Sequence, residues 1–132
     1  MADTYYKDKY TQIMQVPAPD DLIHGWYTAA PIILTGSGDI LRGTLLMSTG
    51  TNTFTPATES GLAGAEELAV LCDDVLGLEE GMTAKAEGYF SGEFLGTRVI
   101  LPYETEESNH SELIEAVKPA LRKHKLIVKG KV

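Results

Sequence analysis

Apolar and polar residues alternate most clearly in the second half of the chain. From Met82 to Leu95, small apolar and aromatic residues alternate with charged ones such as Lys85 and Glu87, which predicts a half-buried antiparallel strand. Gly88 and Gly92 interrupt this run, so we expect a bulge or bend within it. Leu68–Cys72 is apolar at every position, which predicts a strand that is buried on both faces. An acidic connection at residues 76–81 separates the two runs, and residues 97–102 predict a short third strand.

The first half of the chain contains shorter apolar runs that are separated by turn residues. Pro31–Thr35 and Ile40–Met47 flank the turn signal Gly36–Asp39, and this arrangement predicts a β-hairpin. A second turn is expected over Ser48–Thr53, followed by a brief strand that ends at Pro56.

The last quarter of the chain predicts one helix and one strand. Apolar residues recur there at helical spacing: Leu113, Ile114, Val117 and Leu121. Asn109 followed by Glu112 resembles an N-cap with its capping-box partner, so we expect a helix over His110–Lys123. Pro119 lies inside this range and should kink the helix or split it after Val117. Leu126–Val128 is expected to form a final strand.

Residues 1–21 show neither a helical nor a strand period. Tyr5, Tyr6 and Tyr10 lie among charged residues, and an extended, proline-bearing piece follows at Val16, Pro17, Ala18 and Pro19. Such a segment is too polar to fold alone, so it is either a disordered terminus or an arm that becomes ordered on a partner. Tyrosine supplies large amphipathic contact area, which favours neither interpretation decisively but makes the arm a candidate binding element.

These patterns together predict an α+β fold. We expect a small β-rich domain of short, mostly antiparallel strands with one C-terminal helix and a terminal strand, preceded by an extended N-terminal arm. The predicted boundaries are residues 1–21 for the flexible arm and residues 22–132 for a single globular domain. A chain of 132 residues can bury a self-sufficient core without metals or disulfides.

The charge distribution argues against nucleic acid as a direct partner. The net charge is −8, whereas phosphate contacts need a positive surface. Six of the eleven basic residues lie near the C-terminus: Lys118, Arg122, Lys123, Lys125, Lys129 and Lys131. They either favour the dipole at the end of the predicted helix or form a weak partner patch, and the helix interpretation is the simpler one.

The residues that could carry catalysis do not form a recognisable set. Cys72 is the only cysteine and lies in an apolar run, where it is expected to act as a small buried hydrophobe. The three histidines have no metal-ligand spacing, and no nucleophile-elbow motif is present. Asp73–Asp74 and Glu79–Glu80 are sequence neighbours that point to opposite faces of a strand, so we expect a solvated edge. The sequence therefore predicts no enzyme, no metal and no cofactor.

Two further observations bear on location and contacts. The chain shows neither an apolar signal region nor an apolar stretch of membrane-spanning length, so synthesis in a cytoplasm and no membrane contact are expected. Trp26 and Tyr27 follow the arm and are candidates for an interface, although core packing is the favoured role for Trp26.

The order of features over Arg42–Val128 resembles the lambdoid phage head decoration protein family. The matching segments are RGTLL at Arg42–Leu46, FTPA at Phe54–Ala57, ELAVLCDDV at Glu67–Val75, AEGYFSGEF at Ala86–Phe94 and LIEAVKPALRKHKLIV at Leu113–Val128. The chain departs from the family pattern at Lys125, where the family often has the glycine that a helix end favours, and at Leu71–Cys72, where Leu-Ala is more usual.

The resemblance implies a non-enzymatic structural protein of the virion. Members of this family form homotrimers on the outer surface of the expanded phage head, at three-fold positions, where they clamp the major capsid protein and resist DNA pressure. For this chain it implies synthesis in a host cytoplasm and an arm that contacts the shell. The arm residues concerned are Tyr5, Tyr6, Tyr10, Val16, Pro17 and Pro19.

Two other functions remain open from the sequence. One is a small β-rich ligand- or host-surface-binding domain displayed on a virion, which predicts an exposed aromatic platform of Trp26, Tyr27 and Tyr89. The other is a hydrolase, which predicts a pocket where acids from different strands converge; the candidates are Asp73, Asp74 and Glu93.

Overall fold

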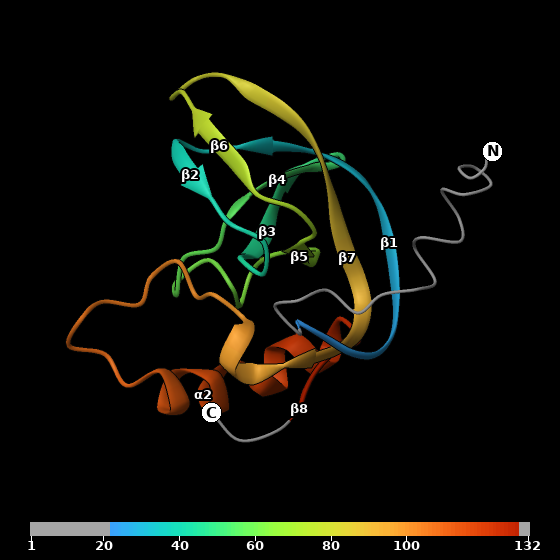
Figure 1. The fold of residues 1–132 in the computed structure, drawn as a ribbon, viewed down its shortest axis with the longest axis vertical. Coiled ribbons are helices and arrows are strands. Elements are labelled where there is room, and N and C mark those ends of the chain that lie inside the picture. The colour runs from blue at the N-terminus through green and yellow to red at the C-terminus, as the bar shows by residue number, and fades with distance from the viewer. Residues whose placement is uncertain (1–21, 130–132) are drawn as a thin grey trace, which may run out of the picture.

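The computed structural model describes residues 22–129 and confirms a β-rich fold with one C-terminal α-helix (Figure 1). The elements in chain order are β1 Ile23–Thr35, β2 Gly38–Ile40, β3 Leu45–Gly50, β4 Thr53–Pro56, β5 Leu68–Leu71, β6 Val75–Leu78, β7 Thr83–Leu95, the 3-10 helix η1 Gly96–Arg98, α2 His110–Lys123 and β8 Leu126–Lys129. Strands β1 and β7 have 13 residues each. β1 is longer than the short strand predicted at Pro31–Thr35, whereas β7 matches the run predicted over Met82–Leu95.

Five of these strands pair in a closed ring. β1 pairs in parallel with β4, and the antiparallel pairs β4–β3, β3–β5, β5–β7 and β7–β1 complete the circuit. β8 lies parallel to the end of β7, and β2 and β6 form a separate two-stranded ribbon. Figure 1 shows β1 and β7 running side by side along one flank, with α2 at the end opposite the ribbon.

Alternation along the strands of the ring builds two cores. On β5, Leu68 and Val70 point to the cluster that includes the buried face of α2, whereas Ala69 and Leu71 point to a second cluster contributed only by strands. All four β5 residues are buried, so the predicted burial of both faces is confirmed. The ring thus has a filled interior and a second apolar layer between its outer face and the helix.

The predicted hairpin between Pro31–Thr35 and Ile40–Met47 is wrong. β1 pairs with β4 and β7, and the second run is divided by a turn at Gly43, whose φ is 96°. A side chain at Gly43 would meet the Arg98 carbonyl oxygen at 2.6 Å, so this close approach of two backbones requires glycine.

The acidic connection expected at residues 76–81 was also misread. Its first residues belong to β6, which pairs with β2 through Ile40 opposite Val75. Leu78 is buried in the ring interior and Val75 packs against the same cluster, so apolar contacts hold β6 in place in a segment that looks polar overall.

The short strand predicted at residues 97–102 does not form. Its start is η1, and the rest contributes one isolated bridge between Ile100 and Thr44. Val99 and Leu101 are buried, so the segment packs as an extended strap without a continuous strand partner.

Strand β7 contains the predicted irregularity between its two glycines. Thr28 lies opposite Ser91 and Ala29 opposite Tyr89, so Phe90 is an extra residue in β7. This bulge reverses the side-chain alternation. Tyr89 and Phe94 therefore reach the helix-side core, while Phe90 packs against the ring interior.

Helix α2 has the predicted bounds, and the Asn109 side chain caps it by accepting a bond from the Glu112 backbone N–H at 3.2 Å. The predicted split after Val117 is wrong, because the helix continues through Pro119 to Lys123. Proline removes one backbone hydrogen bond, but buried residues on both sides of Pro119 hold the helix against the core. The final strand is confirmed as β8.

Candidate functional site

The candidate site is the surface around Trp26, where β1 begins. This side chain is 50% exposed, so the favoured prediction that it packs in the core is wrong. Tryptophan is enriched among the residues that contribute most to binding at the centres of protein interfaces, so the exposed Trp26 marks a candidate contact surface.

A wide bulge in β1 places Trp26 on the surface. Ile23 lies opposite Phe94 and Tyr27 opposite Gly92, so β1 advances by four residues over a stretch in which β7 advances by two. Gly25 has a φ of 151°, and a Cβ there would overlap the Glu93 carboxylate. The bulge therefore depends on glycine, and it turns the tryptophan away from the core.

The exposed indole is held in place by a polar contact. Trp26 Nε1 donates to Glu93 Oε2 at 2.8 Å, and Lys129 Nζ donates to the other carboxylate oxygen, Oε1, at 3.0 Å. These contacts link β1, β7 and β8, and they restrict the ring before any partner arrives. A restricted side chain loses less conformational entropy on binding than a mobile one.

Tyr27 has a different environment from its neighbour. Its ring makes an edge contact with Tyr89, with 5.2 Å between ring centroids, and it packs against the helix-side core. Burial raises the pKa of Tyr27 above its ordinary value, and the nearby Cys72 and Glu87 add to this effect. The aromatic platform predicted from Trp26, Tyr27 and Tyr89 is therefore wrong, because Tyr89 is buried and only Trp26 is largely exposed.

The candidate arm residues Tyr5, Tyr6, Tyr10, Val16, Pro17 and Pro19 lie outside the described residues. The described chain begins at Leu22, which is 1% exposed and accepts a backbone bond from Leu95 N–H at 2.9 Å. The segment that carries the tyrosines therefore joins the domain at a fixed point, four residues before Trp26.

Exposed basic residues lie near the same end of the domain. They are Arg122, Lys123, Lys125 and Lys129, at the end of α2, in the turn after it and at the end of β8 (Figure 1). Arg122 and Lys123 occupy the last turn of α2, as the helix interpretation of the basic C-terminal region predicted. Among these residues, Lys129 reaches the Trp26 site, through the carboxylate of Glu93.

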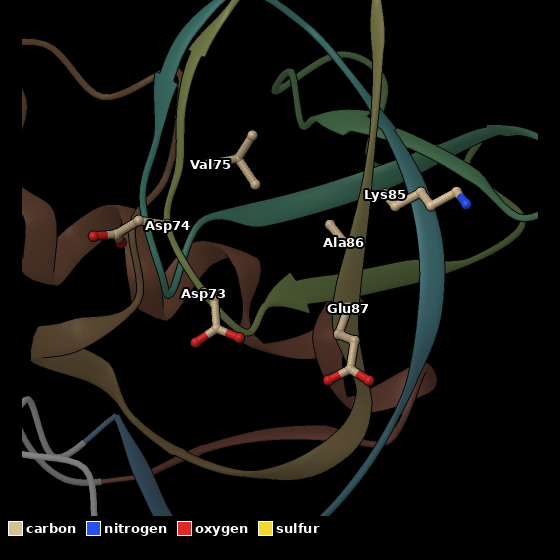
Figure 2. A pocket seen from close by; sticks show the side chains of 6 residues that line it. All are labelled: Asp73, Asp74, Val75, Lys85, Ala86 and Glu87. Carbon is tan, nitrogen blue, oxygen red and sulfur yellow. The ribbon is translucent and has the colours of Figure 1, made fainter.

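The acids proposed for a hydrolase do not converge. A hollow of about 360 Å³ is lined by Asp73, Asp74, Val75, Lys85, Ala86 and Glu87. Figure 2 shows Asp73 and Glu87 at one end of it, with Asp74 turned away. Glu93 contacts Trp26 and Lys129 instead. In residues 22–129, no group of three or more histidine, cysteine or acidic side chains is arranged to hold a metal ion.

The thiol of Cys72 is buried, as predicted. Burial first, and then the nearby Glu87 and Asp73 carboxylates, raise its pKa to about 12. The reactive form of cysteine is the thiolate, so at neutral pH this side chain is a packing group rather than a nucleophile.

Sequence patterns missed one exposed apolar group. Leu41, Leu76 and Met82 lie exposed on or beside the β2–β6 ribbon. Leu76 lies within the segment predicted to be an acidic connection, and Met82 follows it directly. Apolar residues next to Glu79 and Glu80 were the sequence signal that could have indicated these exposed side chains.

The chain matches no model of a known protein family, and no curated protein matches it. None of the helices in the described part of the chain has the length and apolar character that a membrane crossing needs.

Proposed function

We propose that this protein decorates the outer surface of an expanded phage head. It binds there as a homotrimer at three-fold positions, contacts the major capsid protein and stabilises the shell against DNA pressure. The proposal rests on the sequence resemblance over Arg42–Val128 and takes its main structural support from one arrangement. A rigid, exposed tryptophan lies beside the point where a tyrosine-bearing segment joins a small, fully packed domain.

The binding surface combines two elements in this proposal. Trp26, with Glu93 and Lys129 beside it, belongs to the folded domain, whereas Tyr5, Tyr6 and Tyr10 belong to the preceding arm. The arm becomes ordered when it binds, so a single copy binds weakly. A trimer presents three such surfaces at once, and the raised effective concentration converts weak contacts into stable attachment.

The abundance of the protein in purified particles tests the proposal directly. We expect near-equimolar amounts relative to the major capsid protein, and release of the protein when the head is dismantled. A few copies per particle would point to a connector or attachment role. Absence from the particle would overturn the proposal.

Substitution of the arm tyrosines tests the binding surface. Replacing Tyr5, Tyr6 and Tyr10 with serine should abolish co-sedimentation with expanded heads while the circular dichroism spectrum stays unchanged, because residues 22–129 supply two apolar cores of their own. Trp26→Ala should weaken binding by tenfold or more, as expected for a loss of about 2 kcal/mol at an interface centre.

Met82→Ser is the matched control for these variants. Met82 is 57% exposed and lies in the turn between β6 and β7, at the other end of the domain (Figure 1), so its replacement should leave head binding unchanged. Wild-type occupancy by the tyrosine variant would show that the arm does not carry the contact.

A further inference from the structure

The β2–β6 ribbon has one face in the core and one face toward solvent. Ile40 and Val75 lie opposite each other and pack into the strand-only cluster of the ring interior. Side chains alternate between the two faces of a strand, so the residues on either side of this pair share the other face. These residues form the outer ribbon face, and all four are exposed: Asp39, Leu41, Asp74 and Leu76.

The two leucines are unusually exposed for apolar side chains. Leu41 is 44% exposed and Leu76 is 66% exposed, although the residues beside them, Ile40 and Val75, pack against the interior. Figure 2 shows the same alternation on β6, where the Asp74 side chain is directed away from Val75. The outer ribbon face is therefore a sheet face that presents apolar groups to solvent.

The two aspartates on this face are held by the backbone. Asp39 Oδ1 accepts from the Gly77 N–H at 2.9 Å, and Asp74 Oδ1 accepts from the Arg42 N–H at 2.7 Å. Both bonds join the β2 side of the ribbon to the β6 side, so the carboxylates are restricted before any partner binds. Among residues 22–129, neither Oδ2 atom has a hydrogen-bond or ion-pair partner, which leaves two oriented acceptors.

The charge around this face is negative. Residues 38–42 and 73–80 form the ribbon and its flanks, and they contain five acids and one base. The base is Arg42, whose guanidinium donates to the Cys72 carbonyl and to the Tyr89 hydroxyl, and is thus directed inward. Figure 2 shows Lys85 directed away from Asp74. A fixed negative surface attracts a basic partner and disfavours an acidic one.

The spacing on the outer ribbon face matches an extended chain. Asp39 and Leu41 are two residues apart on one strand, as are Asp74 and Leu76 on the other, which corresponds to about 7 Å. One face of an extended segment laid along the ribbon has the same repeat. If every second residue of that segment is alternately basic and apolar, the basic groups meet the carboxylates and the apolar groups meet the leucines. Arginine is the best basic group here, because it donates in a planar fork to carboxylate oxygens.

We propose that the outer ribbon face binds an extended, basic polypeptide segment of a partner protein, in which arginine or lysine alternates with apolar side chains at every second position. Figure 1 shows the ribbon at the end of the domain opposite α2, whereas the Trp26 surface adjoins β8 through Glu93 and Lys129. The two surfaces are therefore separate, and this inference does not depend on the proposed function.

Binding of a synthetic peptide to the full chain tests the proposal. The probe is a fluorescently labelled peptide of eight residues in which arginine, serine, leucine and serine repeat, and fluorescence anisotropy measures its affinity. We expect saturable binding, and binding at least about tenfold weaker when glutamate replaces arginine in the peptide.

Two double variants test the two components of the face. Asp39→Asn with Asp74→Asn removes both charges but keeps the oxygens that accept the backbone bonds, and it should weaken binding at least about tenfold. Leu41→Ser with Leu76→Ser should also weaken it about tenfold, because the apolar contacts are lost. All four positions are exposed, so thermal unfolding should stay close to that of the unaltered chain.

Glu106→Gln with Glu107→Gln is the matched control. It makes the same change in net charge at exposed positions in the loop before α2, so binding should stay within about twofold of the unaltered chain. Equal weakening by this control would show unspecific charge attraction and overturn the proposal. So would an absence of peptide binding, or full binding by the leucine variant. Self-association of the chain that the leucine variant abolishes would assign the face to a second copy instead.

Discussion

Lys125 carries the sharpest backbone constraint in the turn between α2 and β8. Its φ is 65°, in the left-handed region that side chains with a Cβ adopt at a cost. The Lys125 N–H bonds the Arg122 carbonyl at 2.9 Å, and its own carbonyl accepts from Gly92 N–H at 3.0 Å, so the turn fixes β8 against β7. The departure from glycine noted in the sequence therefore falls where glycine would fit best.

Lys125→Gly should stabilise the protein by about 0.5–1 kcal/mol, because it removes the left-handed strain without removing either backbone bond. Thermal or urea unfolding measures this change. Lys123→Gly, two residues earlier in the last turn of α2, is the control and should destabilise by about 1 kcal/mol. A loss of stability in Lys125→Gly would mean that the lysine side chain stabilises the fold by more than its left-handed backbone conformation destabilises it.

His110 joins the start of α2 to the segment before it. Its Nδ1 lies 2.7 Å from Glu104 Oε1, and its Nε2 lies 3.0 Å from the Gly96 carbonyl oxygen. Both partners are acceptors, so the ring satisfies both contacts only as the doubly protonated imidazolium. Partial burial opposes the charge, but the bonds to Glu104 and Gly96 outweigh it and raise the pKa of His110 above 6.5.

The raised pKa predicts a pH dependence of stability. The contribution of His110 is fully present below the unfolded value of about 6.5 and is lost as the pH rises through the higher folded-state pKa. The free energy of unfolding in urea should therefore be measured at about pH 5.5 and about pH 8. The value at about pH 5.5 minus the value at about pH 8 should be more positive for the wild-type chain than for His110→Gln. Equal differences in the two proteins would show that His110 does not carry the effect.

At the scale of elements, α2 tolerates an interior proline because packing compensates for it. Pro119 cannot donate to the Glu115 carbonyl, yet Ile114, Val117 and Leu121 form one continuous buried face. Pro119→Ala restores this donor at an exposed position, so it should stabilise the protein by about 1–2 kcal/mol in urea unfolding. Ala116→Gly, which is exposed on the same helix, should destabilise it and serves as the opposite control. No gain in Pro119→Ala would mean that the helix is already adapted to the missing bond.

Elements were predictable where the local pattern alone decides them. α2 has helical spacing and a cap, β5 is apolar throughout, and β7 alternates, so all three were expected near their observed positions. The β2–β6 ribbon was missed because its pairing depends on Ile40 and Leu78 filling a core that distant strands enclose. A local pattern contains no information about that enclosure.

At the scale of the whole molecule, the closed ring of strands could not be predicted from the sequence patterns. β1 pairs with β4 and with β7, and neither pairing is signalled by a turn between adjacent runs. The position of Trp26 follows from the same long-range pairing, because the bulge that exposes it exists only against β7. The sequence identified Trp26 as a candidate but could not indicate its contact with Glu93, which is 67 residues away.

The pairing of β1 with β7 also sets when the chain can fold during its synthesis. β1 is the first strand of the described chain to leave the ribosome, but its longest partner is β7. At about 5–20 residues per second, the roughly 60 residues from the end of β1 to the end of β7 take about 3–12 s to make. An uncharged strand is therefore exposed for seconds before its partner exists. The ring closes only after residue 95 has been translated, and β1 is the segment from which co-translational aggregation would start.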